Sequence, residues 1–315
     1  MNINNIDLNA LRVFDRVAAT GSFTAAARHF RCAVSSISRQ ISALESSLGQ
    51  PLLYRHTRAV ALTEAGWRYY EEIRGILEQL ELATEALANP APEPAGVLRI
   101  NAPEAFGQRQ IVPLLNQFQR QYTGITAELL LSDQVVDPIR GGHDITFRVG
   151  DLADSSLISR RLANMNYVVA ASPDYVSQCG EPLSPEQLDQ HNCLIYQGEL
   201  GRQRWFFQAR DANTSTPIDV TGNFYSNDPE SLVKAALLGQ GLVLFPTWLI
   251  SEELSEGSLI PLLQDWRSEV SDGQRALYVL TPQRRLGVPK VSAFIDFIFE
   301  QVTPLPSWDC WKNRA

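Results

Sequence analysis

The sequence predicts an α/β protein that begins with an all-α helix-turn-helix module carrying a small wing. Three observations support this fold class: short amphipathic helical patterns and a hairpin pattern fill residues 1–63, one long helical pattern covers 64–88, and strand and helix patterns alternate after a proline-rich linker at 89–96. A chain of 315 residues with 44% apolar residues is large enough for two or more compact units.

Charge is divided unequally along the chain. The overall net charge is -8, but residues 1–63 hold seven arginines and three acidic residues, whereas acidic residues outnumber basic ones both in 64–88 and in the remainder. Because nucleic-acid binding depends on a local basic surface, the acidic total does not exclude DNA as a partner.

The first 48 residues show three apolar helix faces. Leu8, Leu11, Phe14 and Val17 share one face, and Gly21 and Ser22 supply a stop and a new N-cap. The second face consists of Phe23, Ala26, Ala27 and Phe30, and the third of Val34, Ile37, Ile41, Leu44 and Leu48. This spacing turns a polar set away from the core of the third helix: Ser35, Ser36, Ser38, Arg39 and Ser42.

The polar face of the third helix is suited to DNA. Serine hydroxyls can reach phosphates or base edges, and Arg39 can reach a phosphate or the acceptor edge of guanine. After a stop at Gly49 to Pro51, residues 52–62 predict a hairpin with Arg55 and Arg58 near its tip, suited to phosphate or the minor groove. Serines and arginines are also common on solvated helix faces, but the neighbouring hairpin favours DNA binding.

The pattern over 64–88 predicts a long helix capped by Thr63. Its apolar positions recur at heptad spacing and define a candidate dimerisation seam: Tyr70, Ile73, Leu77, Leu80 and Leu87. The alternative is an amphipathic helix packed on its own domain, but the length and acidic outer surface favour pairing.

After the linker, strands are expected at 97–102, 126–131, 145–149, 167–171, 194–196, 242–245 and 276–280. Helices are expected at 109–122, 229–238 and 289–301. This alternation predicts mostly parallel sheets covered by helices.

Several segments resemble the LysR-type transcriptional regulators: "SFTAAARHF", "SSISRQISALESSLG", "PLLYRHTRAVALTEAG", "GGHDITFRVGDLADSSLISRRL" and "ALLGQGLVLFPTWLI". The resemblance covers almost the whole chain and implies a winged helix-turn-helix, a dimerisation helix and a two-lobed effector domain like a periplasmic binding protein. It implies lobe I at about 97–166 and 271–303, lobe II at about 167–270, and a tail at 304–315.

The resemblance also places DNA contacts on Ser35, Ser38, Arg39 and Arg58. The sequence departs from the family pattern at Arg31-Cys32-Ala33, which affects base preference rather than docking. The family implies double-stranded promoter DNA, a small-molecule effector, RNA polymerase and further copies of the chain, as a dimer of dimers, as partners.

The resemblance places an effector cleft between the lobes, where strand ends meet turns or helix starts. The candidate residues are Ala102, Pro103, Glu104, Phe106, Phe147, Arg148, Val149, Asn227, Asp228, Phe245 and Pro246. Arg148 either meets an anionic effector or pairs with Asp144, Asp151 or Asp228, and the three phenylalanines either line a pocket or belong to the core. Hinge crossings are expected near 166–171 and 268–276.

Other function classes lack support. The sequence contains no G-x-S-x-G, Walker A, H-E-x-x-H or G-x-G-x-x-G pattern, so an enzyme is not expected. The four cysteines have neither zinc-site nor disulfide spacing and are expected as buried or partly buried thiols, with no metal or cofactor. A polar start without a signal core argues against a solute-binding protein, and with no apolar stretch long enough for a membrane span it predicts a cytoplasmic location.

Overall fold

The computed structural model describes residues 6–56, 59–88, 93–133, 143–150, 157–198, 201–212 and 214–311. These residues divide into two compact units, one containing the chain up to Glu93 and the other beginning at Pro94. Each unit is described by itself.

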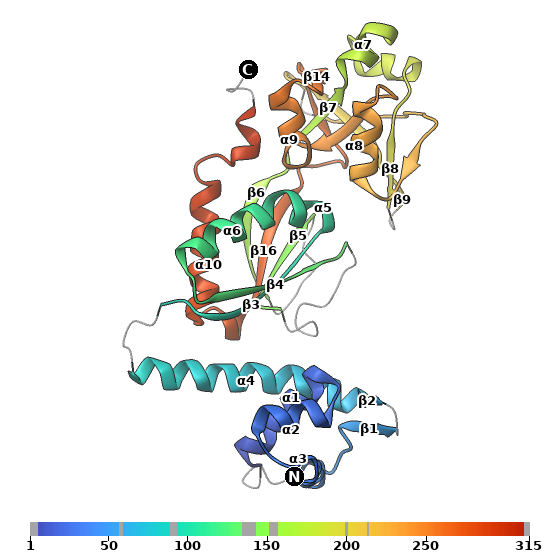
Figure 1. The fold of residues 1–315 in the computed structure, drawn as a ribbon. Coiled ribbons are helices and arrows are strands. Elements are labelled where there is room, and N and C mark those ends of the chain that lie inside the picture. The colour runs from blue at the N-terminus through green and yellow to red at the C-terminus, as the bar shows by residue number, and fades with distance from the viewer. Residues whose placement is uncertain are drawn as a thin grey trace. The chain divides into compact units, whose positions relative to one another are not determined.

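The first unit is helical with a small hairpin (Figure 1). Its elements are α1 Leu8–Thr20, α2 Phe23–Phe30, α3 Val34–Leu48, β1 Leu53–His56, β2 Ala59–Leu62 and α4 Glu64–Ala88. Side chains of α1, α2, α3 and the first half of α4 share one core, in which Phe14, Val17, Ile37 and Ile41 are fully buried. The core holds the polar face of α3 in a defined orientation.

Lobe I of the second unit is built on a sheet with strand order β4-β3-β5-β16-β6. The strands are β3 Gly96–Ala102, β4 Ile125–Leu131, β5 Ile145–Val149, β6 Leu157–Asn164 and β16 Ala276–Pro282. A single helical stretch follows β3 and consists of α5 Glu104–Phe106, the π-helical turn η2 Gly107–Ile111 and α6 Val112–Gln121. Helix α10, Pro289–Val302, meets α6 where the rings of Phe118 and Phe294 lie 4.9 Å apart.

A buried ionic cluster ties α10 to this sheet. Asp144 is fully buried and accepts a hydrogen bond from the backbone N–H of Arg99 at 2.9 Å. Arg285 lies 3.2 Å from its carboxylate, and the Lys290 ammonium lies 3.9 Å from it and donates to the Val97 carbonyl. A buried carboxylate needs such partners, so Asp144 is structural.

Lobe II has a sheet with strand order β11-β10-β15-β7-β13, with β14 also pairing with β7. Its strands are β7 Tyr167–Ala171, β10 Trp205–Ala209, β11 Thr216–Ile218, β13 Val243–Pro246, β14 Ile260–Leu262 and β15 Trp266–Glu269. A smaller sheet joins β12 Tyr225–Ser226, β8 Ile195–Gly198 and β9 Gly201–Arg202 in that order. The helical elements are α7 Pro173–Cys179, η3 Pro185–Gln190, α8 Pro229–Leu237 and α9 Thr247–Glu256.

The expectation of mostly parallel sheets is wrong. In lobe I, β3 runs parallel to β4 and β5, but β16 pairs antiparallel with both β5 and β6. In lobe II, β7 is antiparallel to β13, β14 and β15. The chain enters lobe II between β6 and β7 and returns to lobe I between β15 and β16. The alternation of strands and helices in the sequence predicted parallel strands, but each sheet also contains antiparallel pairs.

The C-terminal segment is part of the folded second unit. Trp308 and Trp311 are 4% and 8% exposed, and Trp308 lies in the short helical turn η5 Ser307–Asp309, whereas the turn η4 Gln283–Arg285 precedes α10. The segment after residue 303 therefore packs through its tryptophans, although the sequence pattern set it apart as a tail.

Candidate DNA-binding surface and interlobe region

The turn between α2 and α3 is made by a residue with left-handed backbone. Arg31 has φ of 51°, and the N–H of Cys32 donates to the Ala27 carbonyl at 3.0 Å. This geometry is a helix C-cap, a position that glycine usually fills. The departure of Arg31-Cys32-Ala33 from the family pattern thus coincides with a tight turn that keeps its hydrogen bonds.

Helix α3 presents two of its predicted DNA-contacting side chains fully to solvent, Ser35 and Arg39, whereas Ser36, Ser38 and Ser42 are half-buried. The Ser42 hydroxyl donates to the Ser38 carbonyl at 2.9 Å, and Arg39 Nε donates to the Ser35 carbonyl at 3.4 Å. Val34, expected in the core, is 44% exposed because it stands in the first turn of α3, before the face that packs.

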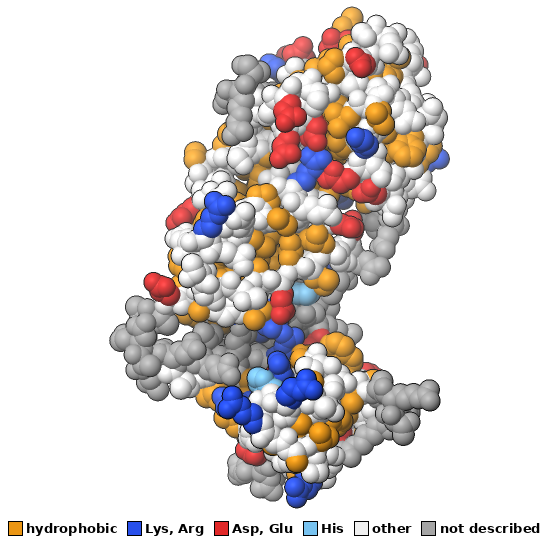
Figure 2. Space-filling model, viewed as in Figure 1, with side chains coloured by type: hydrophobic (Ala, Val, Ile, Leu, Met, Phe, Trp, Pro, Cys, Tyr) orange, Lys and Arg blue, Asp and Glu red, His pale blue; other side chains and the backbone are white. Residues whose placement is uncertain are grey.

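The wing hairpin is anchored at its base. Leu53 pairs with Leu62, and both the Leu52 and Leu53 N–H groups donate to one oxygen of Glu45 on α3. Thr63 caps α4 by accepting from the Gly66 N–H at 2.9 Å. The side chain of Arg55 and the whole of Arg58 lie outside the described residues, so their DNA contacts stay predictions. Figure 2 shows basic side chains on the visible face of this unit.

The predicted seam on α4 is used within the first unit. Tyr70, Ile73 and Leu77 are 7%, 5% and 7% exposed and belong to the core shared with α1. Leu80 is 40% exposed and Ile76, which the heptad pattern did not select, is 53% exposed; the Leu87 side chain lies outside the described residues. For the first half of the seam, packing on the helix's own domain accounts for the apolar pattern.

Several predicted effector residues lie in the core of the second unit. Ala102, Phe106, Phe147, Phe245 and Pro246 are buried. Phe106 stands at the centre of an aromatic cluster, with ring centroids 5.7 Å from Phe147, 5.3 Å from Trp248 and 6.1 Å from Trp308. The core alternative therefore accounts for the burial of Phe106 and Phe147.

The other predicted effector residues are more accessible. Arg148 and Val149 at the end of β5 are half-buried, as is Pro103, whereas Glu104 and Asn227 are exposed. Partial burial lowers the pKa of Arg148.

Asp228 has a structural role. Its carboxylate caps α8 by accepting hydrogen bonds from the Glu230 and Ser231 N–H groups at 3.3 and 3.0 Å. These hydrogen bonds account for Asp228 as a helix cap, and the effector contacts of the other residues stay predictions.

Sequence reasoning missed an ionic contact between the lobes. Arg109 on η2 of lobe I binds Glu230 on α8 through Nε and Nη2, at 2.6 and 2.7 Å, and binds Glu253 on α9 through Nη1 at 2.9 and 3.1 Å. The hydrogen bonds that Arg109 donates to Glu230 and the negative charge of both carboxylates raise the pKa of Arg109. Glu230 and Glu253 lie 121 and 144 positions from Arg109 along the chain, and no local pattern marks them as its partners.

The C-terminal segment also joins this region. Asp309 accepts from the Asn166 side-chain amide at 2.9 Å and from the Thr247 hydroxyl at 2.5 Å. Asn166 lies at the crossing into lobe II and Thr247 at the start of α9. Asp309 therefore fixes the start of α9, the helix that carries Glu253.

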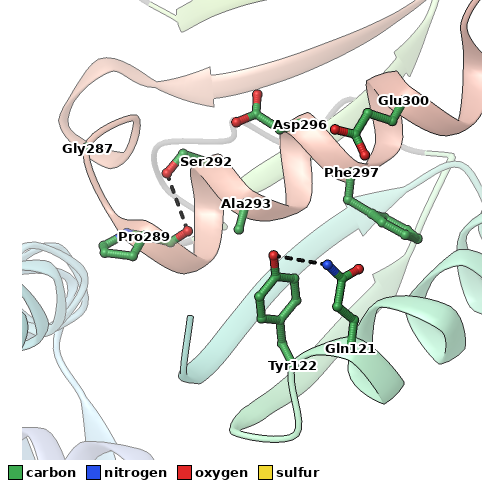
Figure 3. Close-up of a pocket in the computed structure, with 9 residues that line it drawn as sticks. All are labelled: Gln121, Tyr122, Gly287, Pro289, Ser292, Ala293, Asp296, Phe297 and Glu300. Atoms are coloured by element: carbon green, nitrogen blue, oxygen red, sulfur yellow. Dashed lines mark hydrogen bonds between the residues drawn. The ribbon is translucent and has the colours of Figure 1, made fainter. Parts of the chain in front are cut away.

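A hollow of about 500 Å³ lies elsewhere, between the end of α6 and α10 in lobe I (Figure 3). Its lining includes Tyr122, whose hydroxyl accepts from Gln121, together with Asp296 and Phe297 of α10. None of the residues predicted to bind an effector lines it. It is a separate surface feature of lobe I.

Within the described ranges, no group of three or more histidine, cysteine, aspartate or glutamate side chains is arranged to hold a metal ion. No helix in the part of the chain that the structure describes is long and apolar enough to span a membrane. The cysteines are free, and Cys32 and Cys179 are exposed rather than buried as expected.

Known proteins share both units. Residues 8–67 match the model of the bacterial regulatory helix-turn-helix protein, lysR family, and residues 91–303 match the LysR substrate binding domain. An HTH-type transcriptional regulator of Xanthomonas campestris is 35% identical over 294 residues, covering 93% of this chain and 84% of that protein. The HTH-type transcriptional activator AaeR of Escherichia coli is 35% identical over 277 residues, covering 88% of each.

Solved structures of LysR-type regulators are also similar to this chain. CrgA, a LysR-type transcriptional regulator from Neisseria meningitidis, superposes with a TM-score of 0.59 at 32% identity, covering 94% of this chain and 99% of that one. The full-length Vibrio cholerae virulence activator AphB superposes with a TM-score of 0.57 at 33% identity, covering 93% of this chain and 99% of that one. Since the two family models together span most of the sequence and relatives above 30% identity extend over nearly all of it, the chain belongs to the LysR family of bacterial transcriptional regulators.

Proposed function

We propose that this regulator reads promoter DNA with α3 and the wing, and that a small-molecule effector bound between the lobes changes how it does so. The observation that carries the proposal is the exposure of Ser35 and Arg39 on one face of α3, while the opposite face is buried in the core. A helix anchored in this way can insert its polar side chains into the major groove. The half-buried Ser36, Ser38 and Ser42 and the predicted wing residues Arg55 and Arg58 would complete the contacts.

Pairing of two chains through α4 is part of the proposal. The exposed Ile76 and Leu80 provide the apolar surface, since Tyr70, Ile73 and Leu77 are occupied within their own unit. Leu87 stays a candidate from the heptad pattern. Two modules on one duplex recognise two half-sites, and a dimer of dimers would recognise four, so effector-dependent spacing would alter DNA bending and access of RNA polymerase.

Effector control rests on the second unit. Arg148, Val149, Pro103, Glu104 and Asn227 are the predicted effector residues that keep accessible surface, and Arg148 gives the site a preference for an anionic ligand. A coupling of about 1 to 3 kcal/mol between effector and DNA would be enough to switch a promoter.

The test is a footprint of the purified full-length protein on the intergenic DNA beside its own gene. Protection of paired half-sites about one helical turn or a multiple of it apart, centre to centre, is expected. Uniform, salt-sensitive coverage without a protected site would overturn the proposal, because it is the signature of charge alone. Substrates of the enzyme encoded by the divergent neighbouring gene are then screened for a change in that footprint.

A further inference from the structure

Arg109 connects two helices of lobe II to one helix of lobe I. One edge of its guanidinium is matched by both oxygens of Glu230, and the remaining nitrogen is shared by both oxygens of Glu253. The side chains are 18%, 33% and 12% exposed for Arg109, Glu230 and Glu253. In the space-filling view, basic and acidic side chains meet in the region of α8 and α9 (Figure 2).

The backbone around Arg109 is shaped for this contact. Gly107–Ile111 is a π-helical turn inside an otherwise α-helical stretch, a feature that often marks functional sites. It allows consecutive side chains to reach lobe II, because Gln110 Nε2 donates to the Trp248 carbonyl at 2.7 Å beside the Arg109 contacts. One turn earlier, Phe106 packs edge-on against the Trp248 ring.

The same turn is fixed to its own lobe. A Cβ on Gly107 would lie 2.1 Å from Leu131 Cδ2, so the absence of a side chain lets the turn lie close against β4. The turn is also continuous with α5 and α6 of lobe I. Relative motion of the lobes would therefore break the Arg109 contacts.

The arginine belongs to lobe I and both carboxylates to lobe II, so separation of the lobes would open all of these contacts. A guanidinium held by two carboxylates forms charge-assisted bidentate bonds, which are stronger than neutral ones and strict in geometry. Removing Arg109 while the lobes stay in this arrangement would leave Glu253, only 12% exposed, without its cation. An isolated exposed ion pair contributes little, but this partly buried triplet has the properties of a two-state contact.

We propose that Arg109, Glu230 and Glu253 form an interlobe latch that sets the balance between the lobe arrangement described above and a more open one. A ligand shifts such a balance only by binding the two states unequally, so the latch determines how much of the effector's binding free energy is needed to switch the protein. This role rests on the proposed effector control, but the latch itself is measurable without effector or DNA.

The latch is tested by hydroxyl-radical footprinting of the full-length protein with mass-spectrometric readout. Trp248 is 8% exposed behind the latch, and Trp205 in the core of lobe II is fully buried. In Arg109→Gln, the population with open lobes is expected to rise roughly tenfold or more, since hydrogen bonds to charged groups are lost. Trp248 oxidation should rise with it, while Trp205 oxidation stays at the wild-type rate.

Matched variants separate a latch from general stability. Arg210→Gln removes an exposed pair with Asp265 inside lobe II, 3.5 Å apart, and should leave both tryptophans unchanged. The swap Arg109→Glu with Glu253→Arg keeps one arginine facing two glutamates and should lower Trp248 oxidation again. Unchanged Trp248 in Arg109→Gln, no recovery in the swap, or equal rises at Trp248 and Trp205 would each overturn the latch. Failure of operator binding would affect none of these readings.

Discussion

At the scale of single residues, chemical type and burial together decide what each side chain does. Ser35 and Ser42 have the same side chain on the same helix, but Ser35 is exposed and Ser42 is half-buried with its hydroxyl bonded to the helix backbone. The sequence placed Phe106 either in a pocket or in the core, and the side chain lies fully buried among aromatic rings. Exposed polar residues on elements whose other face is buried are therefore better candidates for contact with DNA or ligand than buried aromatic residues.

Arg39→Ala is expected to weaken specific operator binding by about 1 to 3 kcal/mol, because an exposed arginine on the recognition helix can reach a base edge or phosphate. Fluorescence anisotropy with labelled operator DNA measures the loss. Arg16→Ala is the control, since Arg16 is an exposed arginine on α1. Equal effects of the two substitutions would show that only net charge matters.

Cysteine reactivity should follow burial. Cys193 is fully buried, and burial raises its pKa to about 12, so at pH 8 it remains the unreactive protonated thiol. Cys32 and Cys179 are exposed. Iodoacetamide followed by peptide mass spectrometry should label these two in the native protein and Cys193 only after unfolding. Native labelling of Cys193 at a comparable rate would contradict its burial.

At the scale of elements, α4 shows how one helix can serve two purposes. Its first half completes the core of the DNA-binding unit, and Ile76 and Leu80 leave apolar surface on another face. The heptad pattern in the sequence joined Leu80 to the buried positions and did not select Ile76, because an apolar period does not show which partner covers each position.

The start of α4 is sensitive to one added methyl group. Gly66→Ala would favour a helix by propensity, but a Cβ there would lie 1.9 Å from the Leu52 carbonyl oxygen. Backbone must therefore move, and a loss of about 1 to 3 kcal/mol in stability is expected. Urea-dependent hydrogen exchange of peptides within residues 8–88 measures this loss of stability. Slower exchange in the variant would mean that the helix start and the hairpin base are not in contact.

Pairing through α4 predicts that Ile76→Asp with Leu80→Asp shifts the full-length protein toward monomer, since two charges would enter an apolar interface. Light scattering after size exclusion measures the mass. Arg68→Asp, on an exposed position of the same helix, should keep the oligomer. Leu77→Asp is unsuitable because Leu77 is 7% exposed within its own unit. An unchanged mass for the double variant would reject this face.

At the scale of the whole molecule, the second unit consists of two sheets that the chain joins twice, between β6 and β7 and between β15 and β16. Double crossing allows the lobes to move as bodies about short segments. Arg109 joins the two lobes, and Asp309 binds Asn166 at one crossing and Thr247 at the start of α9, so both sets of contacts depend on the lobe arrangement.

Arg148→Ala is expected to abolish the response to effector while operator binding stays within about twofold of wild type, because the substitution lies outside the DNA-binding unit. A promoter fusion in cells measures the response, and anisotropy measures the binding. A full response in the variant would remove Arg148 from the effector site, and loss of both properties would indicate a folding defect.

Local patterns were sufficient for much of the protein. Cap residues such as Ser22 and Thr63, the apolar periods of α1 to α3, and the alternating apolar positions of β5 depend on neighbours a few positions away, so the sequence alone determined these elements and the family. The helix predicted from residue 109 instead begins at Glu104, because the π-helical turn disturbs its period.

Long-range packing determined the rest. Strand direction in both sheets, the burial of Tyr70 and Phe106, and the meeting of Arg109 with Glu230 and Glu253 all depend on residues distant in sequence. A helical or strand period shows that one face of the element is apolar, but it does not show which surface covers that face. In the same way, a charged residue in the sequence does not show which residue it pairs with. The sequence by itself therefore determined what kind of protein this is, and only the tertiary structure decided which side chains bind one another across the lobes.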